Sequence, residues 1–129
     1  MKKGASVLPD TNVLLRYLLK DIPDQYQESL EFFEKVRTGE TEAELPECVI
    51  VEAVYILTKF YGVPRAAAVE SLRGILRYKG VINTDQDQML TALGMYADST
   101  FDVVDCILAV KAKGRILFTF DKKLKKQVA

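Results

Sequence analysis

The hydrophobic positions of the chain fall into short apolar runs and longer segments with a helical period. The short runs predict β-strands at residues 6–9, 45–46, 81–83 and 115–119. The longer segments predict helices at residues 12–20, 24–38, 48–60, 64–80, 85–96 and 102–113. Strands that alternate with helices are typical of an α/β fold with a mostly parallel central sheet.

One of these segments is ambiguous from its composition. Residues 48–60 are rich in β-branched side chains, which favour a strand. The run is long, however, and has no turn signal before Tyr61 and Gly62. We therefore predict a helix for these residues.

The first predicted strand ends at Pro9, which places Asp10 at its carboxyl end with a helix directly behind it. We expect Thr11 or Asn12 to cap that helix. Ligands of open α/β sheets bind outside the carboxyl ends of the strands, so Asp10 is a candidate for chemistry. The alternative is a plain turn or cap residue.

The composition narrows the chemistry and the class of protein. A chain of 129 residues predicts one domain over residues 1–129. The absence of histidine excludes Ser–His and Cys–His nucleophiles and removes the commonest zinc ligand. No apolar run reaches the roughly 18 residues of a membrane helix, and Cys48 and Cys106 have no ligand-like spacing. We therefore expect a cytoplasmic protein without membrane attachment, in which both cysteines are buried free thiols.

The charge is balanced overall but unevenly spread along the chain. Residues 21–52 hold ten acidic and two basic side chains, whereas residues 106–129 hold one acidic and seven basic ones. The basic end favours a polyanionic partner such as nucleic acid. Solvated lysines near a chain end are the alternative.

Four further carboxylates are hard to explain by packing alone. Glu52 is the only charge in a long apolar segment, where an unpaired carboxylate would be costly. Asp102 and Asp105 lie three positions apart at the start of a predicted helix, and Asp121 ends the last predicted strand. Each also has a structural explanation, because Glu52 can reach solvent or pair with Arg16, and the aspartates can cap a helix or complement its dipole.

These carboxylates and Asp10 are expected to meet at one edge of the sheet. Close carboxylates repel each other unless they are protonated or neutralised by a metal ion. All-oxygen ligand sets suit Mg²⁺ or Mn²⁺. Without histidine, metal-activated water is the expected nucleophile, which predicts phosphodiester hydrolysis with the basic segment on the nucleic-acid backbone.

The order of these motifs resembles the PIN-domain family, and most of all the VapC-type toxin ribonucleases of toxin–antitoxin pairs. The resemblance rests on residues 9–16 (PDTNVLLR), Glu52, residues 101–109 (FDVVDCILA) and residues 118–121 (FTFD). It implies a three-layer α/β/α fold with a short central sheet of four or five strands. It also implies an endoribonuclease that uses one or two Mg²⁺ or Mn²⁺ ions, an RNA substrate, a homodimer and a small antitoxin protein.

The resemblance also implies roles for single residues. Asp10, Glu52, Asp105 and Asp121 match the catalytic, metal-binding acidic quartet, and Asp102 matches an extra acid of some members. The expected supporting and RNA-binding residues are Thr11, Asn12, Arg16, Thr119, Lys122 and Lys123. Our mechanistic hypothesis is an in-line attack of water on phosphorus that leaves 5′-phosphate and 3′-hydroxyl ends.

Two other classes of function fit parts of the pattern. A non-catalytic PIN-like module that binds RNA or protein would have no need for mutually repelling acids. An aspartate-based phosphotransfer domain of the phosphatase type needs an acid two residues after Asp10, where this chain has Asn12. A receiver-like domain needs an aspartate at the end of a middle strand, for which Asp85 is a poor candidate.

Overall fold

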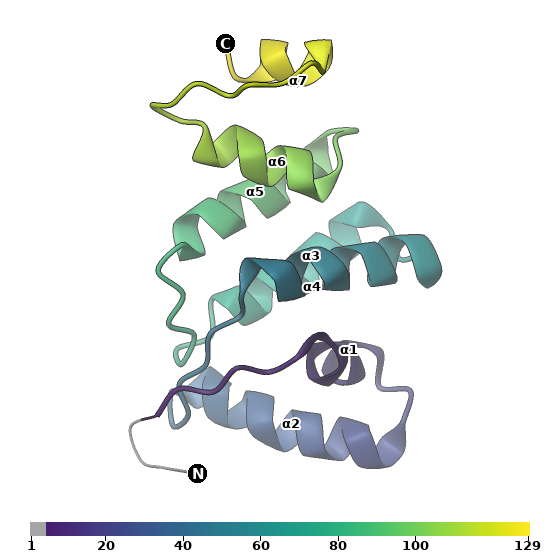
Figure 1. Cartoon of the computed structure of the whole chain (residues 1–129). Coiled ribbons are helices and arrows are strands. Elements are labelled where there is room, and N and C mark those ends of the chain that lie inside the picture. Colours follow the sequence, from purple (N-terminus) through teal and green to yellow (C-terminus); the bar gives the residue numbers. More distant parts are fainter. Residues whose placement is uncertain (1–4) are drawn as a thin grey trace. The chain divides into compact units, whose positions relative to one another are not determined.

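The computed structural model describes residues 5–129 as two compact units, of which the first ends at Thr84 and the second spans Asp85–Ala129. The first unit contains α1 (Thr11–Leu19), α2 (Pro23–Thr38), α3 (Glu47–Tyr55), the π-helical segment η1 (Ile56–Phe60) and α4 (Arg65–Leu76). The second unit contains α5 (Gln86–Asp98), α6 (Val103–Lys111) and α7 (Lys122–Gln127) (Figure 1). The six predicted helices are confirmed, and α7 is an additional one.

Local start and stop signals set the first two helices. Lys20 ends α1 in a left-handed conformation (φ 56°), and its N–H donates to the Arg16 carbonyl at 3.1 Å. Pro23 then begins α2, where its fixed φ and missing N–H suit the first turn. Gly39 ends α2 with a φ of 86°, which glycine adopts without steric cost.

Residues 48–60 are helical, as the length of the apolar run predicts. α3 continues without a break into η1, and it buries Ile50, Ala53 and Val54. The β-branched residues Ile50 and Val54 therefore pack in the core as part of a helix, because tertiary packing overrides the weak preference of such residues for strands. α4 follows Pro64 and buries the predicted face, which consists of Ala68, Leu72, Ile75 and Leu76.

The core of the first unit forms where α1 packs against α2 and α3. Leu14, Phe33 and Ile50 supply one fully buried side chain from each of these helices. The Tyr17 ring stacks on the Phe33 ring with their centroids 4.5 Å apart. This aromatic contact fixes α1 against the middle of α2.

The predicted central parallel sheet does not form within residues 5–129, so the α/β/α fold class is wrong. Three extended segments of the first unit lie side by side, but each bridge between them is isolated. Val7 pairs in parallel with Ala43, and Ala43 pairs in parallel with Val81. The Ala43 N–H donates to the Gly80 carbonyl at 2.8 Å, and the Ile82 N–H donates to the Ala43 carbonyl at 2.9 Å.

Each ladder stops after one bridge for a local chemical reason. Pro9 follows Val7 by two positions and has no N–H to donate. Beyond Ala43, the Asn83 side chain forms the hydrogen bonds to the Leu45 backbone that a neighbouring strand would otherwise form. Its Oδ1 accepts a hydrogen bond from the Leu45 N–H at 2.8 Å, and its Nδ2 donates to the Leu45 carbonyl at 2.7 Å. The predicted segments are therefore neighbours but not strands.

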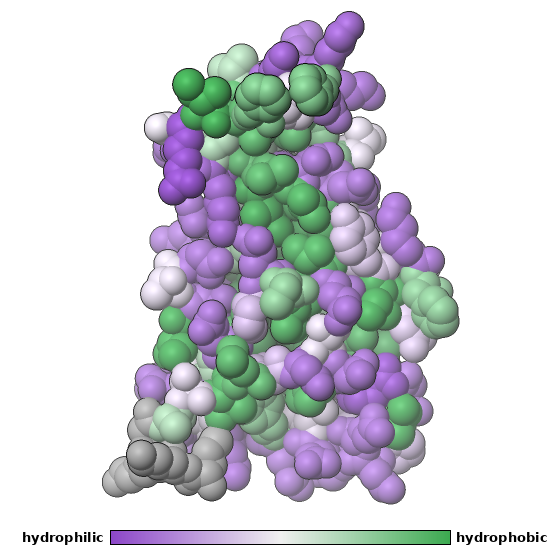
Figure 2. Space-filling model, in the orientation of Figure 1, coloured by the Kyte–Doolittle hydropathy of each residue, from purple (hydrophilic) through white to green (hydrophobic). Residues whose placement is uncertain are grey.

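In the second unit, α6 packs against both α5 and α7. The predicted strand at residues 115–119 is wrong, because these residues form no bridge with any residue from 5 to 129. Its apolar side chains Ile116 and Phe118 are 96% and 83% exposed, and Figure 2 shows hydrophobic surface over the segment that precedes α7. Such residues favour an extended backbone, but a strand also needs a neighbour for its hydrogen bonds.

Both cysteines are free thiols, but only Cys106 is buried. The prediction of a buried thiol is wrong for Cys48, which is exposed in the first turn of α3. Of the helices between residues 5 and 129, none combines the length and apolar character that crossing a membrane requires.

Candidate functional site

Asp10 lies where the sequence places it, between a short extended segment and the start of α1. The helix begins at Thr11, so Asp10 itself is the N-cap, and the prediction of Thr11 or Asn12 as the cap is wrong. The Asp10 Oδ1 accepts a hydrogen bond from the Val13 N–H at 3.1 Å. Thr11 is 8% exposed, whereas the Asp10 carboxylate is exposed and keeps its second oxygen for a ligand.

Arg16 lies two turns further along α1 and is largely enclosed, with 15% of its side chain exposed. Its Nε lies 3.4 Å from the Asp21 carboxylate, an ion pair that lacks hydrogen-bond geometry. Arg16 therefore pairs with Asp21, and not with Glu52 as one alternative held. Glu52 is exposed on α3, so reaching solvent satisfies its charge without a partner.

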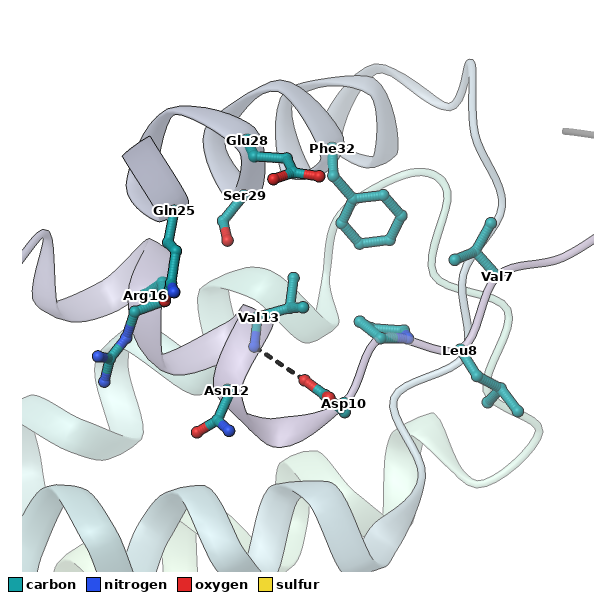
Figure 3. Close-up of a pocket in the computed structure, with 11 residues that line it drawn as sticks. Val7, Leu8, Asp10, Asn12, Val13, Arg16, Gln25, Glu28, Ser29 and Phe32 are labelled. Carbon is teal, nitrogen blue, oxygen red and sulfur yellow. Dashed lines mark hydrogen bonds between the residues drawn. The ribbon is translucent and has the colours of Figure 1, made fainter. Parts of the chain in front are cut away.

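A pocket of about 530 Å³ opens beside Asp10. It lies between the segment 7–10, α1 and α2 (Figure 3). Sequence reasoning brought Asp10, Asn12 and Arg16 to this place but missed the wall that α2 contributes. That wall consists of Gln25, Glu28, Ser29 and Phe32. Their spacing of three and four residues places them on one face of a helix, which is the signal that could have found them.

A second group of acids gathers at the start of α6. Asp102 is the N-cap of this helix, without a side-chain hydrogen bond to it, and Asp105 lies in its first turn. Burial raises the pKa of the Asp105 carboxyl, and the negative charges of Asp102 and then Asp121 raise it further. The structure therefore brings Asp102 and Asp121 close enough to Asp105 for their charges to act on its carboxyl group.

Asp121 caps α7 in the same way that Asp10 caps α1. Its Oδ1 accepts a hydrogen bond from the Leu124 N–H at 3.0 Å. The Asp121 N–H donates to the Thr119 hydroxyl at 3.1 Å, so Thr119 stabilises the turn that positions the Asp121 carboxylate. Lys122 and Lys123 are exposed in the first turn of α7, which is compatible both with a contact to a polyanion and with solvated lysines near the chain end.

The donor chemistry and the donor geometry give different answers about a metal ion. The predicted ligands are all carboxylates, which suits Mg²⁺ or Mn²⁺, and the mutual repulsion at Asp105 is of the kind that a divalent cation relieves. Within the part of the chain that the structure describes, however, no three His, Cys, Asp or Glu side chains are arranged as ligands of one ion. The chemistry fits the metal, although the described side chains do not by themselves form its ligand cage.

Three of the predicted acids, Asp10, Asp102 and Asp121, are N-caps of helices in a chain without histidine, and exposed lysines follow Asp121. The pattern of the PIN-domain family matches residues 7–128 of the chain. The chain therefore belongs to the PIN-domain family, whose members are usually nucleases, generally metal-dependent ribonucleases. Neither a search of curated proteins nor a search of solved structures found a match.

Proposed function

We propose that this protein is a metal-dependent endoribonuclease that hydrolyses phosphodiester bonds of RNA. The observation that carries the proposal is the PIN-domain match over residues 7–128, and the acids Asp10, Glu52, Asp105 and Asp121, which resemble the acidic quartet of the family, support it. Burial and mutual repulsion at Asp105 support the same reading, because perturbed carboxyl groups cluster at functional sites.

In this proposal Asp10, Glu52, Asp105 and Asp121 would hold one or two Mg²⁺ or Mn²⁺ ions, with Asp102 as an additional ligand. The ion would polarise the phosphoryl oxygen and lower the pKa of water. Water adds to the phosphorus in line with the leaving 3′-oxygen, and the products carry 5′-phosphate and 3′-hydroxyl ends.

The remaining predicted residues would orient the substrate. The residues proposed for this task are Thr11, Asn12, Arg16, Thr119, Lys122 and Lys123. The exposed lysines on α7 carry the charge that RNA phosphates require, and Arg16 offers an Nε that is enclosed but without a hydrogen bond. Thr119 acts on Asp121 through the backbone, so it is a positioning residue in this scheme.

We further propose that the nuclease is the toxin of a VapC-type toxin–antitoxin pair, with a small antitoxin as its partner, a homodimeric state and a cytoplasmic location. The motif order of the chain supports this finer assignment. Co-expression with the product of the adjacent reading frame tests it, because an antitoxin should co-purify with the protein and suppress its ribonuclease activity. Unchanged activity in the presence of that product would contradict the assignment.

The test of the proposed reaction uses the cap geometry of Asp10. Asparagine caps a helix as well as aspartate does, so Asp10→Asn removes the charge and keeps the hydrogen bond from the Val13 N–H. With Mn²⁺ and single-stranded RNA, we expect Asp10→Asn to cleave at least about a hundredfold more slowly than wild type, and EDTA to abolish cleavage. The matched control is Glu31→Gln on the exposed side of α2, which should cleave at the wild-type rate.

One observation favours a second candidate, a PIN module that binds RNA without cleaving it. No three of the described side chains form an ion-binding group. In the same assay this candidate predicts that RNA binds equally well with EDTA and that wild type and Asp10→Asn leave the RNA intact. Cleavage that depends on both Mn²⁺ and Asp10 would exclude it.

A further inference from the structure

The pocket beside Asp10 combines an aromatic ring with a free carboxylate. Figure 3 shows the Phe32 ring projecting from α2 toward the segment that carries Asp10, and the Glu28 side chain lying along α2 next to Phe32. Glu28 and Phe32 are one helical turn apart, so they form neighbouring parts of one wall. Among residues 5–129, no side chain forms a hydrogen bond or ion pair with Glu28, so both of its oxygens can accept from a ligand.

The half-buried Phe32 ring contacts an aromatic side chain of the core. It packs edge-on against Phe33 with ring centroids 4.9 Å apart. Phe33 is fully buried and stacks in turn on Tyr17. Phe32 therefore contacts the aromatic core of the first unit and also lines the pocket.

The size and the walls of the pocket fit a flat polar ring. A volume of about 530 Å³ lies within the roughly 300–1,000 Å³ of small-ligand sites. Val7, Val13 and Phe32 supply apolar contacts, and Ser29 adds a hydroxyl from a residue that is 5% exposed. Single-stranded RNA is read in this way, by stacking on an aromatic ring and by hydrogen bonds to a base edge.

The Glu28 carboxylate determines which base the pocket favours. Guanine carries two adjacent donors on its Watson–Crick edge, N1–H and the 2-amino group, and one carboxylate can accept both. Adenine, cytosine and uracil each place an acceptor next to their donor on this edge, so a carboxylate gains one hydrogen bond and is repelled by the partial negative charge of the acceptor. A free glutamate next to a ring platform therefore favours guanine.

Two other residues that line the pocket, Arg16 and Asp10, have roles in the proposed reaction. Arg16 lines the same pocket, and its guanidinium, which pairs with Asp21 without forming a hydrogen bond at Nε, can donate to a phosphate. Asp10, a proposed metal ligand, lies on the opposite side from Phe32. A base held on α2 would thus leave its phosphate near both residues.

We propose that this pocket binds a guanine base of the RNA substrate, stacked on Phe32 and read by Glu28. The inference rests on the proposed function, because it assumes that RNA is the substrate. It adds a sequence preference, and it assigns specificity-determining roles to Glu28 and Phe32.

The binding test uses fluorescein-labelled hexanucleotides UUXUUU, in which X is guanosine, inosine or adenosine. Inosine differs from guanosine only by lacking the 2-amino group. With wild-type protein in EDTA, fluorescence anisotropy should show about tenfold tighter binding for guanosine than for inosine or adenosine. Glu28→Gln should bring the ratio of the guanosine and inosine dissociation constants close to one, and Glu31→Gln should leave it unchanged. Phe32→Leu should weaken all three ligands about fivefold or more.

Two outcomes overturn the inference, and both differ from failure of the nuclease. Equal binding of the three hexanucleotides by wild type excludes base recognition, and a guanosine preference that survives in Glu28→Gln excludes the role of this pocket. The same oligonucleotides with Mn²⁺ report on cleavage separately. Guanosine preference without cleavage overturns the proposed reaction but supports the pocket, whereas cleavage without base preference overturns the pocket alone. Circular dichroism melts of each variant show that it is folded.

Discussion

A single added methyl group at Gly80 should destabilise the fold strongly. A Cβ there would overlap the Thr41 carbonyl oxygen and would lie 2.7 Å from the Val36 carbonyl oxygen. Both obstacles are backbone atoms, which cannot swing away as the end of a side chain can. The Gly80 backbone also cannot retreat freely, because its N–H donates to Val36 at 2.8 Å and its carbonyl accepts from Ala43 at 2.8 Å.

The expected magnitude follows from these contacts. Overpacking costs about 1–3 kcal/mol, and disturbing two hydrogen bonds adds about 1 kcal/mol each. Gly80→Ala should therefore lower the free energy of unfolding by about 3–5 kcal/mol. For a chain of this length that corresponds to a fall of roughly 10–15 °C in the unfolding midpoint.

Gly74 provides a matched control with the opposite sign. It lies inside α4, and a Cβ there would meet nothing within 4 Å. Gly74→Ala should therefore raise the free energy of unfolding by about 0.5–1 kcal/mol, through helix propensity alone. Urea unfolding of both variants, followed by far-ultraviolet circular dichroism, measures the difference. If Gly80→Ala unfolds within 1 kcal/mol of wild type, the close approach of these backbones is refuted.

Three further predictions concern polar groups. Asn83→Ala should lower the free energy of unfolding by about 2–4 kcal/mol in urea titrations, because it leaves the N–H and the carbonyl of the buried Leu45 without this partner; an unchanged midpoint would contradict the pairing. The pKa of the Asp105 carboxyl is raised above 3.8 by burial and by the charges of Asp102 and Asp121. The folded protein therefore binds the proton of this carboxyl more tightly than the unfolded chain does, and ionisation of Asp105 opposes folding. Wild type should therefore lose stability relative to Asp105→Asn as the pH rises through the raised pKa, and parallel stability curves would exclude the effect. Millimolar Mn²⁺ should raise the thermal midpoint of wild type more than that of Asp105→Asn, and equal shifts would argue against Asp105 as a ligand.

The helices were predictable because their signals act within about one turn of the residues that carry them. Pro23 and Gly39 bound α2 by their own backbone preferences, which no distant contact needs to supply. The strands were not predictable in this way, because an extended segment becomes a strand only when a neighbour accepts its hydrogen bonds. Asn83 shows the difficulty, since its side chain takes the place of that neighbour at Leu45.

The candidate site was predictable to the extent that its residues lie at helix starts. Asp102 and Asp105 share the start of α6, and position alone indicated that they would be close. The α2 wall of the pocket was missed because Glu28 lies among other acids on a helix, a pattern that is typical of a solvated face. Only the packing of α2 against α1 reveals that Glu28 and Phe32 line the same pocket as Asp10.

The cap at Asp10 has a genetic consequence. Aspartate and asparagine codons differ by one base, and both residues satisfy the Val13 N–H at the start of α1. A single transition would therefore yield a chain that accumulates normally, escapes the proteases that remove unfolded proteins, and lacks the proposed cleavage. The abundance of such a variant in a cell would therefore say nothing about its activity.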